Sequence, residues 1–145
     1  FHSVRNALDV VKQDPDLGDD DLIAVHDGVR PFVSEKVITD CFHVAAESGA
    51  AVAALPMVDS LREVQPDGTS QALDRSRYFA VHTPQVFRAR LLLRAYEAPY
   101  SSLFTDDASV VEALGEHIAL VPSNRENIKI TTPLDLAIAR ELLGT

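Results

Sequence analysis

Short apolar runs, separated by stretches with helical spacing, predict an α/β chain. Residues 22–25 and 51–55 are continuously apolar, as in strands that are buried on both faces of a parallel sheet. Between them, Ser34 has the chemistry of a helix N-cap and Gly49 that of a helix stop. A strand, a helix and a second strand in this order predict a Rossmann-like, mostly parallel sheet with flanking helices.

The same patterns predict further elements on both sides of this unit. Thr132, Pro133 and Asp135 provide the cap, first-turn proline and capping-box acid of a final helix. No repeat or linker interrupts the chain, so we expect residues 1–145 to form a single domain. The other elements expected are helices at residues 3–12, at 88–98 and after a cap at Thr105, and strands at 78–82, 118–121 and 128–130.

A hairpin is predicted in the middle of the chain. Residues 60–64 and 70–73 flank Pro66-Asp67-Gly68-Thr69, a sequence that favours a reversing turn. The flanking segments carry few large apolar side chains to bury against their own domain. We therefore expect residues 59–77 to form a β-arm that projects from the domain and contacts a partner subunit.

Composition and charge narrow the class of protein. The hydrophobic content of 46% is ordinary for a globular domain, and no apolar run reaches the ~20 residues of a membrane span. No signal peptide opens the chain, so we expect no membrane attachment. A net charge of −9, from 22 acidic and 13 basic residues, disfavours nucleic-acid binding. Cys41 is the only cysteine, which excludes an intrachain disulfide and favours a reducing compartment, the cytoplasm or a plastid-like organelle.

The strongest local signal follows the first predicted strand, at His26-Asp27-Gly28-Val29-Arg30-Pro31. In open α/β sheets, ligands bind beyond the carboxyl ends of the strands. A carboxylate at Asp27 can there hold Mg²⁺ that also contacts phosphate oxygens, and Arg30 suits a phosphate or a structural carboxylate. The alternative is that Asp27 only begins a turn and Arg30 forms a local ion pair.

Weaker signals lie further along the chain. Lys129, between two isoleucines, can contact a phosphate, although the pattern alone favours a solvent-exposed side chain. Thr83 precedes a proline in a predicted loop, and Thr105 is a predicted helix cap; structural roles are common at both kinds of position. The helix N-terminus at Thr105 is also a possible anion site. Arg75 either forms a surface ion pair with Asp74 or is carried by the arm into a neighbouring subunit's site.

These motifs also form an ordered set. The segments concerned are residues 3–8, 26–31, 59–60, 74–75, 82–85, 105–108 and 127–136. Together, in order and spacing, they resemble the 2-C-methyl-D-erythritol 4-phosphate cytidylyltransferases over essentially the whole chain. Each motif is weak alone, but the ordered set is specific.

The resemblance implies a Rossmann-like subunit that dimerises through its arm. The implied reaction is attack of the sugar phosphate on the α-phosphorus of CTP, with release of pyrophosphate and a requirement for Mg²⁺ or another divalent cation. Asp27 resembles the metal-binding carboxylate, and Lys129, with Arg75 from the partner's arm, resembles the catalytic pair that positions the sugar phosphate. The residues that the resemblance places around the substrate are Arg30, Ser60, Thr83 and Thr105.

Two departures from the family pattern follow from the sequence. Ser60 stands where the family often has threonine, which preserves the hydroxyl group. Family members also begin with a strand and a glycine-rich loop whose arginine and lysine hold the CTP triphosphate, and no segment here corresponds to it. We therefore expect residues 1–145 to be a truncated nucleotidyltransferase domain of a longer protein, inactive or nearly so by itself.

Two alternatives stay open at this point. A pentitol-phosphate cytidylyltransferase, such as one acting on ribitol 5-phosphate, shares the motifs around Asp27 and Lys129, although the run at residues 127–133 favours methylerythritol phosphate. The other is a non-catalytic half-domain that dimerises through its arm and binds a sugar phosphate without turnover.

Overall fold

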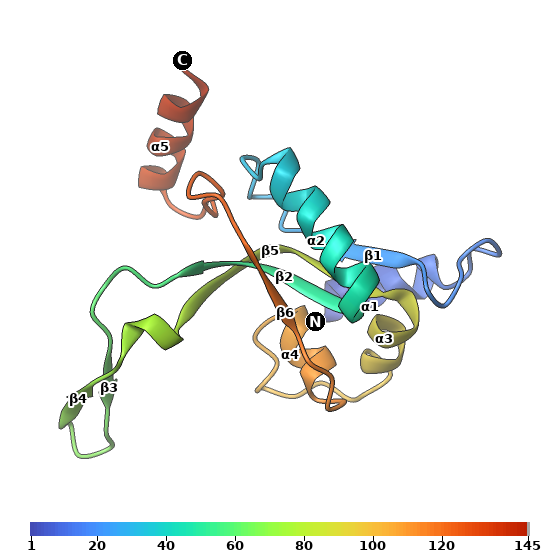
Figure 1. Ribbon diagram of the computed structural model, residues 1–145, viewed down its shortest axis with the longest axis horizontal. Coiled ribbons are helices and arrows are strands. Elements are labelled where there is room, and N and C mark those ends of the chain that lie inside the picture. The colour runs from blue at the N-terminus through green and yellow to red at the C-terminus, as the bar shows by residue number, and fades with distance from the viewer. Residues whose placement is uncertain (145) are drawn as a thin grey trace.

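The computed structural model describes residues 1–144 and combines helices with a central sheet and a separate hairpin (Figure 1). The α/β fold class predicted from the sequence is confirmed. In chain order, the elements are α1 (His2–Val11), β1 (Leu22–Val25), α2 (Glu35–Ser48), β2 (Ala50–Pro56), β3 (Arg62–Val64), β4 (Ser70–Ala72), the 3₁₀ turn η1 (Arg75–Arg77), β5 (Phe79–Arg88), α3 (Ala89–Ala95), α4 (Asp107–Glu112), β6 (Ala119–Pro122) and α5 (Pro133–Leu143).

The central sheet has the strand order β1-β5-β2-β6. β5 runs antiparallel to both β1 and β2, whereas β2 and β6 are parallel, so β1, β2 and β6 point in the same direction. The prediction that residues 22–25 are buried on both faces of a parallel sheet is wrong: β1 pairs with β5 alone, and Ala24 is exposed. A run of apolar residues predicts that a strand is buried, but it does not predict the direction of the neighbouring strand.

Alternating side chains of the sheet fill two core layers, because neighbouring residues of a strand point to opposite faces. Val52 and Phe87 belong to the layer that packs against α1, α3 and α4. Their neighbours Ala53 and Val86 belong to the layer beneath α2, which also contains the fully buried Cys41. Both faces of the central strands are therefore covered by helices.

Several element boundaries differ from the predicted ones. β5 extends far beyond the predicted strand at 78–82, because the Thr83-Pro84-Gln85 segment continues the sheet with a cis Thr83–Pro84 peptide bond. Residues 128–130 form no strand. The Ile130 amide donates a hydrogen bond to the Val29 carbonyl, in the loop after β1, at 2.9 Å. The cap of α4 is Asp106, whose carboxylate accepts from the Ser109 amide, and not Thr105 as predicted.

The predicted hairpin is confirmed. β3 and β4 pair with Val64 opposite Ser70, and the Gln65 amide donates to the Thr69 carbonyl at 2.8 Å. Gly68 has φ of +84°, a left-handed conformation that glycine adopts without strain. Every residue of β3 and β4 is exposed, and the arm extends away from the sheet in Figure 1.

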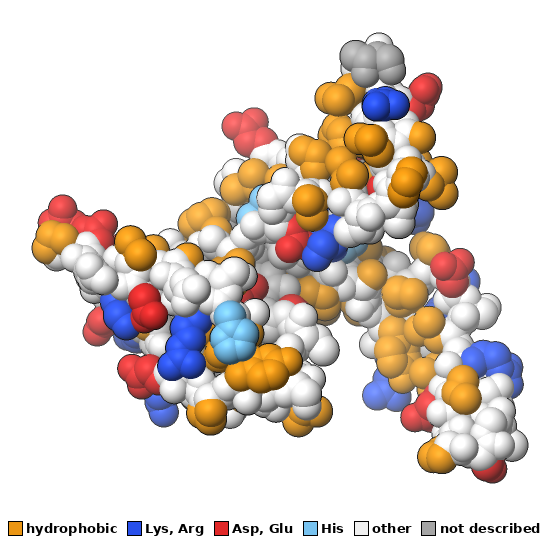
Figure 2. All heavy atoms as spheres, turned by 180° about the vertical axis from the view of Figure 1, so that it is seen from behind, with side chains coloured by type: hydrophobic (Ala, Val, Ile, Leu, Met, Phe, Trp, Pro, Cys, Tyr) orange, Lys and Arg blue, Asp and Glu red, His pale blue; other side chains and the backbone are white. Residues whose placement is uncertain are grey.

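The final helix, α5, begins with the predicted capping box, in which Thr132 and Asp135 bond reciprocally. It stands apart from the sheet and exposes many apolar side chains, as the back view in Figure 2 shows. Within residues 1–144, no helix has the length and apolarity needed to cross a membrane. The large apolar side chains that α5 exposes are Leu134, Leu136, Ile138, Leu142 and Leu143.

Packing of α3 gives a direct test of this core. Leu92 is completely buried, whereas Leu103, in the loop after α3, is 81% exposed. We expect Leu92→Ala to lower the free energy of unfolding by about 2–5 kcal/mol through lost burial and a residual cavity. The matched Leu103→Ala variant should change it by less than about 0.5 kcal/mol. Urea titration measures both, and equal costs would contradict this packing.

Candidate functional site

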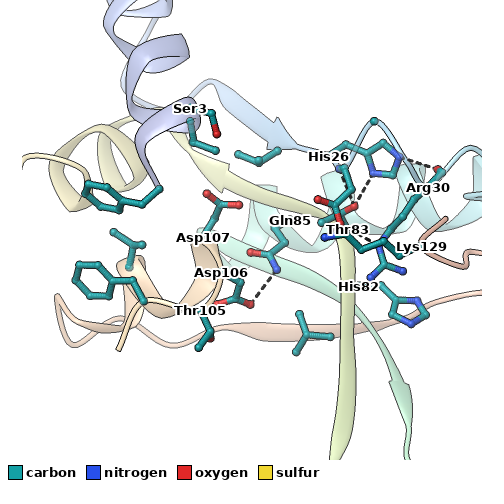
Figure 3. A pocket seen from close by; sticks show the side chains of 18 of the residues that line it. Ser3, His26, Arg30, His82, Thr83, Gln85, Thr105, Asp106, Asp107 and Lys129 are labelled. Atoms are coloured by element: carbon teal, nitrogen blue, oxygen red, sulfur yellow. Dashed lines mark hydrogen bonds and ion pairs between the residues drawn. The ribbon is translucent and has the colours of Figure 1, made fainter. Parts of the chain in front are cut away.

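A cavity of about 590 Å³ opens beside the loop that follows β1 (Figure 3). Its walls come from that loop, from the middle of β5, from the first turn of α4 and from the segment before α5. The start of the chain and the connection between α3 and α4 complete them. Five of the predicted site residues line it, although they come from four separate parts of the chain. These residues are Asp27, Arg30, Thr83, Thr105 and Lys129.

Asp27 is the centre of charge on one side of the cavity. Its Oδ2 atom lies 3.1 Å from Arg30 Nε and also 3.1 Å from Lys129 Nζ. Partial burial raises the pKa of Asp27, but hydrogen bonds and charges from Lys129 and Arg30 outweigh this effect and hold the pKa below its usual value. The Asp27 carboxyl is therefore ionised at neutral pH, and Lys129 turns toward the cavity despite the solvent-facing preference of its pattern.

Arg30 joins this cluster to a buried amide. Its side chain is only 11% exposed, and Nη1 donates to the Asn127 carbonyl at 2.7 Å. Asn127 is fully buried, and its Nδ2 donates to the Thr83 carbonyl at 2.8 Å. Its Oδ1 atom is buried without a hydrogen-bond partner among the described residues. Asn127 thereby holds the segment that carries Lys129 against β5.

The loop after β1 is held in place by hydrogen bonds to β5. The Asp27 amide donates to Thr83 Oγ1 at 3.0 Å, and the same oxygen lies 2.9 Å from His26 Nδ1. His26 Nε2 lies 3.0 Å from the Arg30 carbonyl oxygen. His82, also on the cavity wall, bonds Ser123 Oγ through Nδ1, and burial together with the Arg30 charge lowers the pKa of His82.

The opposite side of the cavity is acidic. Asp106 and Asp107 lie at the start of α4, and the buried Gln85 stands between them and the basic cluster in Figure 3. Gln85 donates to Asp106 Oδ2 at 3.0 Å and accepts from the Ala108 amide at 2.8 Å. Burial raises the pKa of Asp107, which accepts a hydrogen bond from the Tyr96 hydroxyl.

Several backbone amides at the start of α4 already donate hydrogen bonds to side chains of the same segment. The Ser109 amide donates to Asp106, and the amides of Thr105 and Asp106 donate to Ser109 Oγ. The anion site considered for this helix N-terminus has no free donor left at these positions. Thr105 is exposed at the cavity edge, and its amide is among those already bonded.

Two predicted site residues lie outside the cavity. Ser60 and Arg75 are on the arm, and Arg75 donates to the Val58 carbonyl. Asp74 does not pair with Arg75 as considered from the sequence, because its carboxylate caps η1 by accepting from the Ser76 amide. The chain by itself therefore brings together five of the seven predicted side chains.

Sequence reasoning missed three polar residues that hold these walls together. Gln85 lies in a strand between apolar neighbours, and such a polar residue must find partners inside the core. Asn127 precedes a mixed apolar segment and His26 precedes Asp27, but neither position by itself distinguishes a scaffolding side chain from a solvated one. Their roles depend on contacts across 44 and 57 residues of sequence.

Residues 1–144 contain no cluster of three or more His, Cys, Asp or Glu side chains that could enclose a metal ion. The basic cluster instead suits a ligand that brings oxygen atoms of its own. Asp27 Oδ1 has no hydrogen-bond partner among the described residues, and Mg²⁺ is commonly held by one or two carboxylates together with substrate phosphates. The donor set thus fits a divalent cation shared with a phosphate compound.

An α/β sheet with a carboxylate, an arginine and a lysine converging at a strand end is an arrangement that suits phosphate ligands in the Rossmann-like class of folds. Comparison with known proteins specifies the class further. The chain belongs to the IspD family, 2-C-methyl-D-erythritol 4-phosphate cytidylyltransferase, whose sequence model matches residues 1–145.

Individual relatives have the same name. The chain is 51% identical to the 2-C-methyl-D-erythritol 4-phosphate cytidylyltransferase of Porphyromonas gingivalis and 48% identical to that of Phocaeicola vulgatus, covering 99% of this chain and 62% of each relative. The crystal structure of the Francisella tularensis cytidylyltransferase superposes with a TM-score of 0.83 at 32% identity, over 96% of this chain and 65% of that one. The chain thus spans less than two thirds of these relatives.

Acid titration tests the ion pairs of Asp27. Because its folded pKa is lowered, the carboxylate stabilises the fold above the unfolded pKa of about 3.9, and this contribution is lost as the pH falls through the folded pKa. Between about pH 5 and pH 3, the wild type should therefore lose more free energy of unfolding than Asp27→Asn. Urea titrations at a series of pH values measure the difference, and identical pH slopes would exclude the effect.

Proposed function

We propose that the protein containing this chain transfers the cytidylyl group of CTP to 2-C-methyl-D-erythritol 4-phosphate. A phosphate oxygen of the sugar phosphate attacks the α-phosphorus, a new P–O bond forms, and the bond to the leaving pyrophosphate breaks. The observation that carries the proposal is the Asp27–Arg30–Lys129 cluster at the cavity of a family member. Because the chain spans 62% of the relatives, the proposal concerns the full-length protein.

Charge explains why this cluster suits the reaction. Two phosphate-bearing substrates repel each other, so positioning and neutralisation supply most of the catalysis in such transfers. Lys129 is 47% exposed and can turn from Asp27 to a phosphate, whereas Arg30, largely buried, braces the carboxylate. Asp27 would hold a divalent cation, Mg²⁺ or an equivalent, which supplies charge neutralisation at the phosphates when bound. Thr83 and Thr105 contribute oxygen atoms to the same walls.

The arm supports a homodimer with shared sites. Arg75 and Ser60 lie outside their own subunit's cavity. Val64 on the arm and Val58 just before it are 69% and 54% exposed. A two-fold contact between two arms would cover these side chains and bring Arg75 to the partner's cavity. There, its guanidinium would hold the sugar phosphate that Lys129 also contacts. We place this dimer in the cytoplasm.

Turnover with alternative substrates tests the proposal directly. The full-length protein is expected to release pyrophosphate from CTP with methylerythritol phosphate at a far higher kcat/KM than with ribitol 5-phosphate. The family match and the named relatives favour the first substrate. A preference for ribitol phosphate would overturn the substrate assignment, and binding without turnover would leave only a sugar-phosphate-binding dimer.

Removing the Asp27 charge tests its proposed role. In the full-length protein, Asp27→Asn should cut turnover by at least ~10²-fold and weaken Mn²⁺ binding, measured by electron paramagnetic resonance, because the cation loses its anionic ligand. Asp40→Asn is a matched control, since it breaks a Lys–Asp pair on the surface of α2 and away from the cavity. Near-normal turnover of Asp27→Asn would remove this residue from the mechanism.

Mixing two inactive variants tests whether sites are shared. Arg75→Ala and Lys129→Ala should each be inactive, but a mixed dimer has one site with both residues and one site with neither. Random re-association yields half mixed dimers, so activity should return to about a quarter of the wild-type value. Mass spectrometry confirms that mixed dimers form. If they form and activity stays absent, Arg75 acts within its own subunit and the arm is only a dimerisation device.

A further inference from the structure

We propose that His26 is a positioning residue of this site, acting through Thr83 and Arg30 on the carboxylate of Asp27; the inference rests on the proposed function. His26 is bonded through both ring nitrogens, to Thr83 Oγ1 at 2.9 Å and to the Arg30 carbonyl oxygen at 3.0 Å. One of these two partners is on β5, and the other ends the Asp27–Arg30 turn.

The hydrogen-bond roles follow from the chemistry of the partners. A carbonyl oxygen only accepts, so His26 Nε2 must carry a proton and donate it to Arg30. Thr83 Oγ1 already accepts from the Asp27 amide at 3.0 Å, and in a neutral ring Nδ1 is a bare acceptor. In a neutral ring, the Thr83 hydroxyl proton then points to His26 Nδ1. A neutral imidazole with the proton on Nε2 satisfies all three groups together.

This arrangement fixes Asp27 both from β5 and from the end of the Asp27–Arg30 turn. The Asp27 amide bonds a threonine that is itself oriented by His26, and the Arg30 amide closes the turn by donating to the Asp27 carbonyl at 3.0 Å. Because Thr83 is only 8% exposed and its proton is committed, it can serve a ligand only as an acceptor. A substrate hydroxyl fits that role better than a phosphate oxygen, which also needs a donor.

His26 contributes to the geometry of the site, whereas other side chains supply the charge beside Asp27. Lys129 and Arg30 supply the positive charge beside Asp27, and both nitrogens of His26 are occupied by protein partners, so the ring is not free to exchange a proton with substrate. Partners that orient a metal-binding side chain typically change affinity or activity by about 10- to 100-fold when they are removed. We expect the loss of His26, which helps to position Asp27, to lower cation affinity and activity on that scale.

A double-mutant cycle in the full-length protein tests the inference. His26→Phe keeps a ring but removes both bonds, and Thr83→Val removes the hydroxyl while keeping the shape. Each should lower kcat and Mn²⁺ affinity by roughly 10-fold, and the double variant should be no worse than about either single one, since both break one network. His26→Asn, which retains an acceptor near the Nδ1 position, should recover part of the loss.

The control is His43→Phe, which removes an exposed histidine from the outer surface of α2. It should leave kcat and Mn²⁺ affinity unchanged. Additive losses in the double variant, or a His26→Phe protein within about twofold of wild type in both measurements, would overturn the proposal.

Nitrogen-15 NMR of the imidazole distinguishes failure of this inference from failure of the proposed function. The wild-type His26 spectrum should show a protonated Nε2 and a bare Nδ1, and Thr83→Val should shift the Nδ1 resonance. Observation of this tautomer in a protein without cytidylyltransferase activity would reject the function and keep the network. A protonated Nδ1 with a bare Nε2 would reject the network whatever the activity.

Discussion

The site depends on one oxygen atom, Asp27 Oδ2, which is shared by Arg30 and Lys129. Two neighbouring cations repel each other, and the carboxylate that lies beside both of them offsets this repulsion. The ion pair between Asp27 and Lys129 also connects the loop after β1 with the segment before α5. No regular strand pairing joins these two segments. Under the proposed function, a phosphate that entered this cluster would replace the carboxylate as the counter-ion of Lys129, whose side chain already lies at the cavity.

Buried polar side chains keep this arrangement rigid. Asn127 joins the lysine segment to β5, Gln85 joins β5 to α4, and Thr83 joins β5 to the Asp27 loop. All three contacts converge on the same stretch of β5, the central strand that pairs with both β1 and β2. Polar groups without partners are costly in a core, so each bond specifies one position for the segment that it holds. These three walls of the cavity are therefore all positioned by contacts with β5.

Local chemistry made part of this structure predictable. The capping box at Thr132, the glycine stop at Gly49 and the turn at Gly68 depend on neighbouring residues alone, and all three occur as expected. The direction of β5 and the exposed edge of β1 depend on pairing between distant segments, which apolar runs do not encode. For the same reason, the sequence indicated Asp27 as a candidate but did not reveal the histidine and amide that hold its surroundings. The roles of Ser60 and Arg75 depend on a second subunit and stay predictions.

The opposed charges of the cavity have a consequence for selectivity. Arg30 and Lys129 stand at one side and Asp106 and Asp107 at the other, with Gln85 between them (Figure 3). A compound with a phosphate at one end and hydroxyl groups at the other meets a favourable potential in only one of its two orientations, because carboxylates repel phosphate but accept from hydroxyls. Such a compound would therefore be aligned by the field before it makes close contact. Under the proposed function, regioselectivity, the choice of which end of a polyol phosphate reacts, would follow from the charges that line the cavity.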